Sequence, residues 1–396
     1  MLIKSFKEEC VNLFKNKINL VVLFVIPILT VILIGAELSG EVINNIPIAV
    51  INYDGSAFSR QLVDKFDQDE TFNVTYYPET EQELEELMKN SKVRAGLIIP
   101  KDFYNDITLL KSPTVLMIYD GSHMSITSAA KAKATEILLT YKAGATIQQL
   151  TGRLNMSYEE AFNITQAFQF NNRVLYNPKK SFNDFLAPIL MAGCVQAALA
   201  LTATVSVNHN IYYETRKKRL GYASGKVLFY SLIGSLSFMM CIVIQILFFG
   251  VTFIGSIFDA FILSLALSFA DSAFCVLVSA VIKNRMVALV GGAVLFIPNS
   301  AMAGTTWPLI SMPVGYRGFA IYMPFAHYVN NIRNIYLKGT SLQQLMNDVT
   351  YLLAFGTIFL IITEIVMIIA AQDNDHEELT NNDLPRSLQE GISIDI

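Results

Sequence analysis

Long apolar runs lie near both ends of the chain, and a long polar stretch separates the first run from the others. A helix that spans a membrane needs about 20 mostly apolar residues. By this measure the chain is predicted to be an α-helical polytopic membrane protein with six transmembrane helices. The predicted spans are residues 18–36, 185–207, 227–254, 258–282, 286–303 and 351–371.

The first run follows four lysines and therefore looks at first like a signal peptide. Its apolar stretch is too long for the apolar core of a typical signal peptide, and no clear cleavage site of small residues follows. We interpret residues 18–36 as an uncleaved span. Pro27 inside it is tolerable, because neighbouring helices can satisfy the freed backbone groups.

The polar stretch, residues 37–182, has a different pattern, in which short apolar runs alternate with polar helical segments. Runs of strand type occupy residues 47–53, 72–77, 93–99 and 114–119. A helix capped by Ser56 and a solvated helix at 79–90 lie between them. This alternation predicts an inserted α/β or α+β domain. Helical segments at 125–150 and 158–170 predict a stalk that returns to the second span.

The distribution of lysine and arginine predicts the orientation, because short cytoplasmic loops are enriched in both. With six spans, the basic N-terminal stretch, the loop after span 2 and the turn after span 4 all fall on one side. The link between spans 3 and 4 has no basic residue. Both termini are therefore predicted to be cytoplasmic, with an acidic tail at residues 373–396. Residues 37–182 are predicted to be extracellular, in a plasma-membrane protein.

Composition narrows the classes of function. Hydrophobic residues make up 53% of the chain and charged residues 16%, whereas soluble domains carry about 25% charged residues. The chain has no broad basic face, which argues against nucleic acid as a partner. Its four cysteines form no CxxC pair, so neither a disulfide framework nor a metal site is expected. No residue of the predicted outer domain has a catalytic pattern.

Two ionisable residues lie inside predicted spans, Asp271 in span 4 and Glu364 in span 6. An ionisable group in mid-membrane costs at least about 2.5 kcal/mol and is a functional candidate. Gln196 and Gln245 have side chains that can hydrogen-bond between helices. Asp271, Gln196 and Gln245 are thus candidates for a substrate pathway. The competing interpretation, which we favour for both acids, is structural pairing across a helix interface.

The loop 210–226 reads NIYYETRKKRLGYASGK and combines an acid, a basic cluster and glycines. One interpretation is a basic loop against anionic lipid; the other is a short docking helix for a soluble partner. GYASGKV does not match a phosphate-binding loop, because that motif has four residues between its glycines and Ser or Thr after its lysine. The chain is therefore not expected to be an enzyme or to hydrolyse nucleotide itself.

Residues 304–349 mix glycines, prolines and aromatic residues and are too polar to span a membrane. Residues 325–337 form a short amphipathic pattern with Gly339 as its stop. Tyrosine and tryptophan here are residue types of the membrane interface. We expect a re-entrant or interfacial hairpin on the outer face.

Three features together resemble an ABC-2 type transporter permease, of the subclass with a large external domain between spans 1 and 2. An outer domain that opens with PIAVINYD and later has RAGLIIP follows a basic N-terminal segment and a span. ETRKKRLG follows span 2, where the family has its coupling helix. A late string runs from GTTWP through Met312-Pro313, Pro324-Phe325 and Arg333 to Lys338-Gly339. The resemblance covers essentially the whole chain.

The resemblance implies an exporter of a lipid-like, amphipathic or drug-like cargo, or of a polymer. Two ATPase subunits would bind ATP and Mg²⁺ and act on two permease copies, either identical or paralogous, so this chain itself needs no cofactor. The family's coupling position maps onto Glu214, Arg216, Arg219 and Gly221. The segment 1–17 would lie along the cytoplasmic interface. Tyr222-Ala-Ser-Gly departs from the family's usual Thr and hydrophobic helix after the glycine.

Two other functions remain open at the level of sequence. One is a membrane-anchored receptor or assembly factor with a ligand-binding outer domain. The other is a proton-coupled secondary transporter that uses Asp271. Inverted repeats, which are common in secondary transporters, are not apparent in the sequence.

Overall fold

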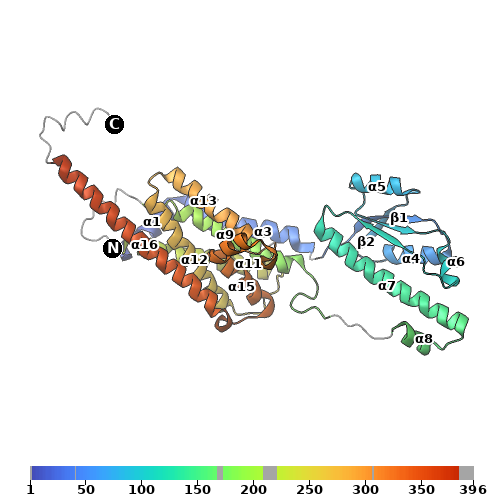
Figure 1. Cartoon of the computed structure of the whole chain (residues 1–396). Coiled ribbons are helices and arrows are strands. Elements are labelled where there is room, and N and C mark those ends of the chain that lie inside the picture. Colours follow the sequence, from blue (N-terminus) through green and yellow to red (C-terminus); the bar gives the residue numbers. More distant parts are fainter. Residues whose placement is uncertain (1, 41, 167–172, 208–220, 306, 383–396) are drawn as a thin grey trace. The chain divides into compact units, whose positions relative to one another are not determined.

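The computed structural model describes residues 2–40, 42–166, 173–207, 221–305 and 307–382, and Figure 1 shows their helices and strands. The chain divides into two compact units. The sheet unit is Val42–Val174, and the helical unit combines Met1–Glu41 with Leu175–Ile396. Each unit has its own hydrophobic core.

Helices account for the regular structure described in the helical unit. It opens with α1 (Leu2–Lys15), α2 (Lys17–Leu20), a π-helical turn (Val21–Val25), α3 (Ile26–Glu37) and a 3₁₀ turn (Leu38–Gly40). The later helices are α9 (Phe182–Ala203), α11 (Tyr222–Phe249), α12 (Ile257–Val281), α13 (Arg285–Met302), α14 (Val314–Tyr322), α15 (Pro324–Lys338) and α16 (Met346–Asn382). The 3₁₀ turns Leu309–Ser311 and Leu342–Leu345 precede α14 and α16.

Five helical stretches in the described residues are long and apolar enough to cross a membrane: Lys17–Gly40, Phe182–Ala203, Tyr222–Phe249, Ile257–Val281 and Leu342–Ala370. They overlap five of the six predicted spans. The other predicted span, 286–303, lies on α13, whose described apolar stretch Arg285–Val294 is shorter. Six crossings therefore stay a prediction. α11 also starts earlier than expected, so the predicted loop 210–226 ends inside a helix.

The π-helical turn Val21–Val25 ends two residues before Pro27. Proline has no backbone N–H, and its ring crowds the carbonyl one turn earlier. A widened turn is a known way for a helix to absorb such a disruption. The first apolar helix therefore continues past Pro27 to Glu37 instead of ending there.

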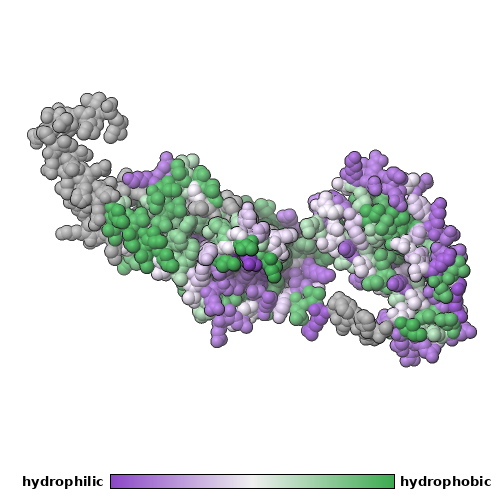
Figure 2. Space-filling view, viewed as in Figure 1, coloured by the Kyte–Doolittle hydropathy of each residue, from purple (hydrophilic) through white to green (hydrophobic). Residues whose placement is uncertain are grey.

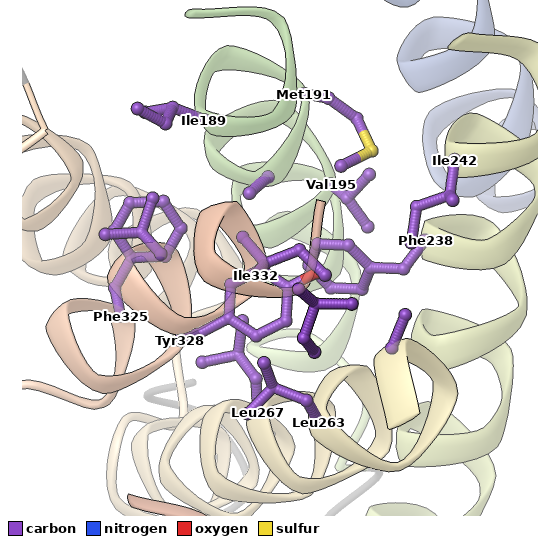
Figure 3. Close-up of a cluster of buried hydrophobic side chains, with 14 of the residues drawn as sticks. Ile189, Met191, Val195, Phe238, Ile242, Leu263, Leu267, Phe325, Tyr328 and Ile332 are labelled. Carbon is purple, nitrogen blue, oxygen red and sulfur yellow. The ribbon is translucent and has the colours of Figure 1, made fainter. Parts of the chain in front are cut away.

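The core of the helical unit is built mainly from α9, α11, α12 and α15, and Figure 3 labels ten of its side chains, which come from these four helices. Met191 and Val195 of α9 lie beside Phe238 of α11 and Ile332 of α15 (Figure 3). All four are almost fully buried. Apolar side chains also cover much of the unit's outer surface (Figure 2), including exposed Leu29, Leu247, Phe248, Ile361 and Ile365. A surface of this kind suits contact with lipid.

The predicted amphipathic segment 325–337 forms α15, which ends at Gly339 in the left-handed conformation, with φ +66°. Its apolar side is buried against α9 and α12. Tyr328 shares a hydrogen bond of 3.1 Å with Ser264, and the Tyr336 hydroxyl donates to Gln245 at 2.9 Å. The segment is thus packed into the helical bundle rather than lying against its surface.

The sheet unit has the mixed strand and helix order that the sequence predicted. Its strands are β1 (Ile46–Asn52), β2 (Phe72–Tyr76), β3 (Ala95–Ile99) and β4 (Leu116–Tyr119), in the order β2-β1-β3-β4. β1 is parallel to β2 and β3, and β4 is antiparallel to β3. The helices are α4 (Ala57–Asp67), α5 (Glu81–Lys89), α6 (Phe103–Thr108), α7 (Met124–Leu154) and α8 (Tyr158–Thr165).

Alternating residues of the central strands pack against helices on the two faces of the sheet. Ile48 and Val50 belong to the core shared with α4 and α7, whereas Ile51 belongs to the core shared with α5. Successive strand side chains point to opposite faces, so both faces need apolar cover. Gly96 permits close packing of α5, because a Cβ there would come within 2.8 Å of the Leu84 side chain.

Asp120, at the end of β4, has its carboxyl pKa lowered to about 2 by hydrogen bonds from Ser122 and by Arg94. The Arg94 guanidinium lies 2.6 Å from the carboxylate. A carboxyl group with a lowered pKa stabilises the folded state above its unfolded pKa of about 3.9, and that contribution is lost as the pH falls through the folded pKa. Asp120 is thus a structural turn residue.

We expect Arg94→Met to lower the melting temperature of the sheet unit at neutral pH. The difference from wild type should shrink as the pH falls from about 4 toward 2, because Asp120 then becomes neutral in both proteins. Thermal unfolding of residues 42–174 across this pH range measures the effect. Lys92→Met removes an exposed charge nearby and serves as the control. A difference that is independent of pH would contradict this account.

Candidate functional site

The predicted coupling residues lie mostly outside the described residues. Glu214, Arg216 and Arg219 belong to the segment 208–220, which is not among them. Gly221 is described and precedes α11 as its N-terminal cap. Its φ of +86° is in the left-handed region that favours glycine. A side chain there would also come within 3.3 Å of the backbone nitrogen of Leu2.

The first turn of α11 packs directly against the N-terminal helix α1. The Ser5 hydroxyl donates to the carbonyl oxygen of Tyr222 at 2.9 Å, and Ser5 is buried. A Cβ on Gly225 would collide with the Leu2 carbonyl oxygen and approach the Ser5 Cβ to 2.8 Å. The sequence Tyr222-Ala-Ser-Gly, which departs from the family pattern, thus places a glycine where two helix backbones meet.

A buried ion pair also holds α1 and α11 together. The Lys226 ammonium bonds to the Glu9 carboxylate, and only 4% and 6% of these two side chains are exposed. Lys226 also donates to the carbonyl oxygen of Ser206 at 2.6 Å, and the Tyr230 hydroxyl donates to Glu9 at 3.0 Å. The pair therefore joins α1, α11 and the segment that follows α9.

The sequence pattern places Lys226 at the end of the predicted loop 210–226 and gives no role to Glu9 or Tyr230. A weak signal was present, because Lys226 and Tyr230 lie four residues apart and so share one helix face. Ser5, Glu9 and Leu13 have the same spacing on α1, and all three are buried. Neither pattern shows that these faces of α1 and α11 pack against each other, because that contact depends on the tertiary structure.

Glu364 of α16 supplies a third contact to the first turn of α11. Its carboxylate accepts from the backbone N–H of Ser224 at 3.0 Å and from the Ser224 hydroxyl at 2.9 Å. The first N–H groups of a helix have no partner within the helix, and the positive end of the helix dipole favours an anion. Glu364 is thus paired structurally, as we favoured for this acid.

These contacts define a junction, hereafter the α11 junction, in which α1 and α16 both hold the first turn of α11. Gly221, Ser224, Lys226, Glu9 and Glu364 form it. The chain enters this turn directly from residue 220.

The proposed pathway residues separate into two groups. The Gln196 amide donates to both carboxylate oxygens of Asp271, at 3.2 and 3.1 Å, between α9 and α12. Asp271 is fully buried and Gln196 is 1% exposed. Gln245 lies apart from them and donates to the Ala187 carbonyl oxygen at 2.8 Å. Asp271 thus has a partner across a helix interface, which is the structural interpretation.

Two buried hydroxyls accompany Asp271 on α12. Ser268 and Ser272 are both fully buried, and neither hydroxyl has a hydrogen-bond partner among the described residues. Among the same described residues, no group of three His, Cys, Asp or Glu side chains is placed to hold a metal ion. At this point α12 therefore places groups that can form hydrogen bonds inside an apolar bundle.

Comparison with known proteins links this architecture to transport. A family model described as ABC-2 family transporter protein matches residues 17–364, from the start of α2 to Glu364. ABC transporter G family member 20 of Dictyostelium discoideum is 22% identical over 93% of this chain and 50% of its own length. The chain thus spans about half the length of that relative.

Two Escherichia coli relatives are closer to this chain in length. The probable multidrug ABC transporter permease YbhR is 20% identical over 84% of this chain and 88% of its own length. YbhS, which has the same description, is 20% identical over 71% of this chain and 74% of its own length. No solved structure matches significantly. With five apolar helices of spanning length and a family match over most of its residues, the chain is a multi-pass membrane protein that belongs to the ABC-2 family of transporter proteins.

Proposed function

We propose that the chain is the membrane permease of an ATP-binding cassette exporter, coupled through residues 210–226 to a separate ATPase subunit that binds ATP and Mg²⁺. The observation that supports this most is the α11 junction. It follows the predicted coupling residues Glu214, Arg216 and Arg219 in the sequence, and its contacts hold the first turn of α11 to α1 and α16. ABC-2 permeases in general work with such ATPases.

In this proposal, closure of the ATPases pushes on the loop and moves the first turn of α11. The buried pair Lys226–Glu9 and the contact Glu364–Ser224 make α1 and α16 follow. The helical unit then exchanges inward-facing and outward-facing states. ATP can shift this equilibrium only if the loop binds the ATPase differently in the two states.

The proposed assembly has two ATPase subunits and two permease copies. The cargo is amphipathic, lipid-like or drug-like, or a polymer; a drug-like cargo is favoured because YbhR and YbhS are described as multidrug permeases. Both termini are proposed to be cytoplasmic, and residues 37–182 to form an extracellular domain.

The double variant Glu214→Ala with Arg216→Ala tests the coupling loop. Hydrogen bonds to charged groups are worth about 1.5–3 kcal/mol each. The loss of one such bond is sufficient to weaken ATPase binding about tenfold. We therefore expect at least a tenfold fall in the ATPase that co-purifies with the permease, and a matching loss of ATP-driven export.

The control for the coupling loop is Lys283→Ala with Asp375→Ala, which removes one base and one acid from other segments predicted to be cytoplasmic. This control should retain the ATPase. Equal retention by both double variants would show that docking does not depend on the loop. Loss in both would show that the effect is not specific to it.

The orientation has its own test in a cysteine-free background. Glu85→Cys places a thiol on exposed α5, and Lys217→Cys places one in the coupling loop. A membrane-impermeant maleimide should label Glu85→Cys in intact cells, and Lys217→Cys only after the membrane is permeabilised. Labelling of both in intact cells would overturn the proposed topology and, with it, the coupling mechanism.

A further inference from the structure

A cleft in the helical unit runs along α1 and is also lined by residues at the ends of α9, α11 and α13. It contains a cavity of about 750 Å³ beside a second of about 510 Å³. The two cavities have five lining residues in common: Glu9, Asn12, Lys15, Ser206 and Arg285. They therefore adjoin along one face of α1, and the buried Lys226–Glu9 pair lines the larger cavity.

The lining of the larger cavity carries an excess of positive charge. Its basic residues are Lys4, Lys7, Lys15, Lys226 and Arg285, and its acids are Glu8 and Glu9. Both acids are already engaged, Glu9 by Lys226 and Glu8 by Lys4 at 3.8 Å. Lys7, Lys15 and Arg285 make no ion pair within the part of the chain that the structure describes. An anion in the cleft would therefore meet three cations without an ion-pair partner among the described residues, of which Arg285 donates one long bond of 3.5 Å to the carbonyl oxygen of Val205.

The lining of the cleft also contains a buried hydroxyl that has no hydrogen-bond partner among the described residues. This is the hydroxyl of Ser206, which lines both cavities. Buried polar groups nearly always have a partner, so such an exception needs an explanation. A phosphate oxygen is a suitable acceptor for this hydroxyl, and its negative charge suits the neighbouring basic side chains.

The surroundings of the cleft are apolar and exposed. On α1, Ile3 is 69% exposed, Val11 50% and Phe14 73%. On α13, Met286 is 71% and Val290 54% exposed. A helix with an exposed apolar side and lysines beside it is suited to lie at a membrane interface. A ligand with both a phosphate and hydrocarbon chains fits these surroundings better than a soluble anion does.

We propose that this cleft binds the headgroup of an anionic phospholipid. The phosphate lies among Lys7, Lys15 and Arg285 and accepts from Ser206, and the acyl chains extend along the exposed apolar sides of α1 and α13. The lipid thereby joins α1 to α13 beside the α11 junction. This inference requires neither the proposed ATPase coupling nor a particular cargo.

The test uses the purified full-length chain in two bilayers, phosphatidylcholine alone and an equimolar mixture of phosphatidylcholine and phosphatidylglycerol. Native mass spectrometry measures the phosphatidylglycerol retained per chain. Each basic residue near an anionic membrane surface contributes about 1 kcal/mol, which is about fivefold in affinity. Lys15→Gln with Arg285→Gln should therefore weaken retention about 30-fold, whereas wild type should retain the anionic lipid and exclude phosphatidylcholine.

Lys17→Gln with Lys283→Gln is the matched control, because it removes two nearby positive charges that line neither cavity. It should retain phosphatidylglycerol like wild type. If the control loses as much lipid as the cleft variant, the attraction is diffuse and the site does not exist. Unchanged retention in the cleft variant overturns the proposal as well.

Competition with inorganic phosphate distinguishes a lipid headgroup from a soluble anion as the ligand of the cleft. An excess of phosphate should displace little phosphatidylglycerol if the acyl chains contribute, and complete displacement would assign the cleft to a soluble anion and overturn the lipid proposal. Should the double variant fail to fold, Lys7→Gln on the exposed side of α1 repeats the test with one charge and an expected loss of about fivefold.

Discussion

Lys226→Met is expected to lower the free energy of unfolding of the helical unit by about 3–5 kcal/mol, because it leaves the Glu9 carboxylate buried without its counter-ion. Only 6% of the Glu9 side chain is exposed, so its carboxylate is largely desolvated. The Tyr230 hydroxyl still donates to Glu9 at 3.0 Å. One neutral hydrogen bond does not offset the removal of a charge of opposite sign.

The double variant Glu9→Met with Lys226→Met distinguishes a paired charge from a simple loss of packing. Replacing both members of a buried ion pair by apolar residues is often neutral or stabilising. We therefore expect the double variant to be more stable than Lys226→Met alone, with a clear coupling energy in the double-mutant cycle. Unfolding in mixed micelles of detergent and denaturing surfactant measures all three variants.

Lys283→Met is the control for Lys226→Met, because Lys283 is exposed and makes no ion pair with a described residue. Its replacement should change stability by less than about 0.5 kcal/mol. Two results would contradict the role given to the pair. One is a Lys226→Met protein as stable as wild type, and the other is a double variant destabilised by the sum of the single changes.

Asp271→Leu is expected to cost about 1–3 kcal/mol, because it leaves the buried Gln196 amide without an acceptor. The amide donates to both carboxylate oxygens of Asp271 and is 1% exposed. Asp271→Asn retains an acceptor oxygen of nearly the same size at the same place, so it should be close to neutral. Gln196→Leu combined with Asp271→Leu should recover much of the lost stability.

The same variants separate the proposed exporter from a proton-coupled carrier. Asparagine cannot take up or release a proton, so a carrier that used Asp271 for coupling would lose transport in Asp271→Asn. Under the proposed function, Asp271→Asn retains ATP-driven export in reconstituted vesicles, while Asp271→Leu loses it in proportion to its loss of folded protein. Cys275→Ala, one turn further along α12, controls for any change in this helix.

The sequence was most informative where structure depends on neighbouring residues. Ser56 was predicted to cap a helix, and its side chain accepts from the Ser59 N–H at 3.0 Å at the start of α4. The glycine stop at Gly339 and the strand-type runs that became β1 to β4 have the same local origin. Caps, turns and side-chain periodicity act over a few residues, so a single sequence contains them.

The boundaries of the apolar helices were less well predicted, because hydropathy marks the part of a helix that lies in lipid and not its polar first turn. α11 begins at Tyr222, before the apolar run that predicted it at residue 227. Lys226 therefore lies in a helix, whereas the hydropathy pattern predicted that it ends the loop 210–226. A charged residue in a first turn looks the same in sequence whether solvent or a partner surrounds it.

Long apolar helices, an inserted unit of strands and helices, and an ionisable residue inside span 4 all follow from the local pattern of the sequence. Tertiary structure alone decided the partners: Glu9 for Lys226, Glu364 for Ser224 and Gln196 for Asp271. The residues of these pairs are separated by 217, 140 and 75 positions. Periodicity and hydropathy fix which face of each helix is apolar or polar, but only the packing of whole helices brings two polar faces together.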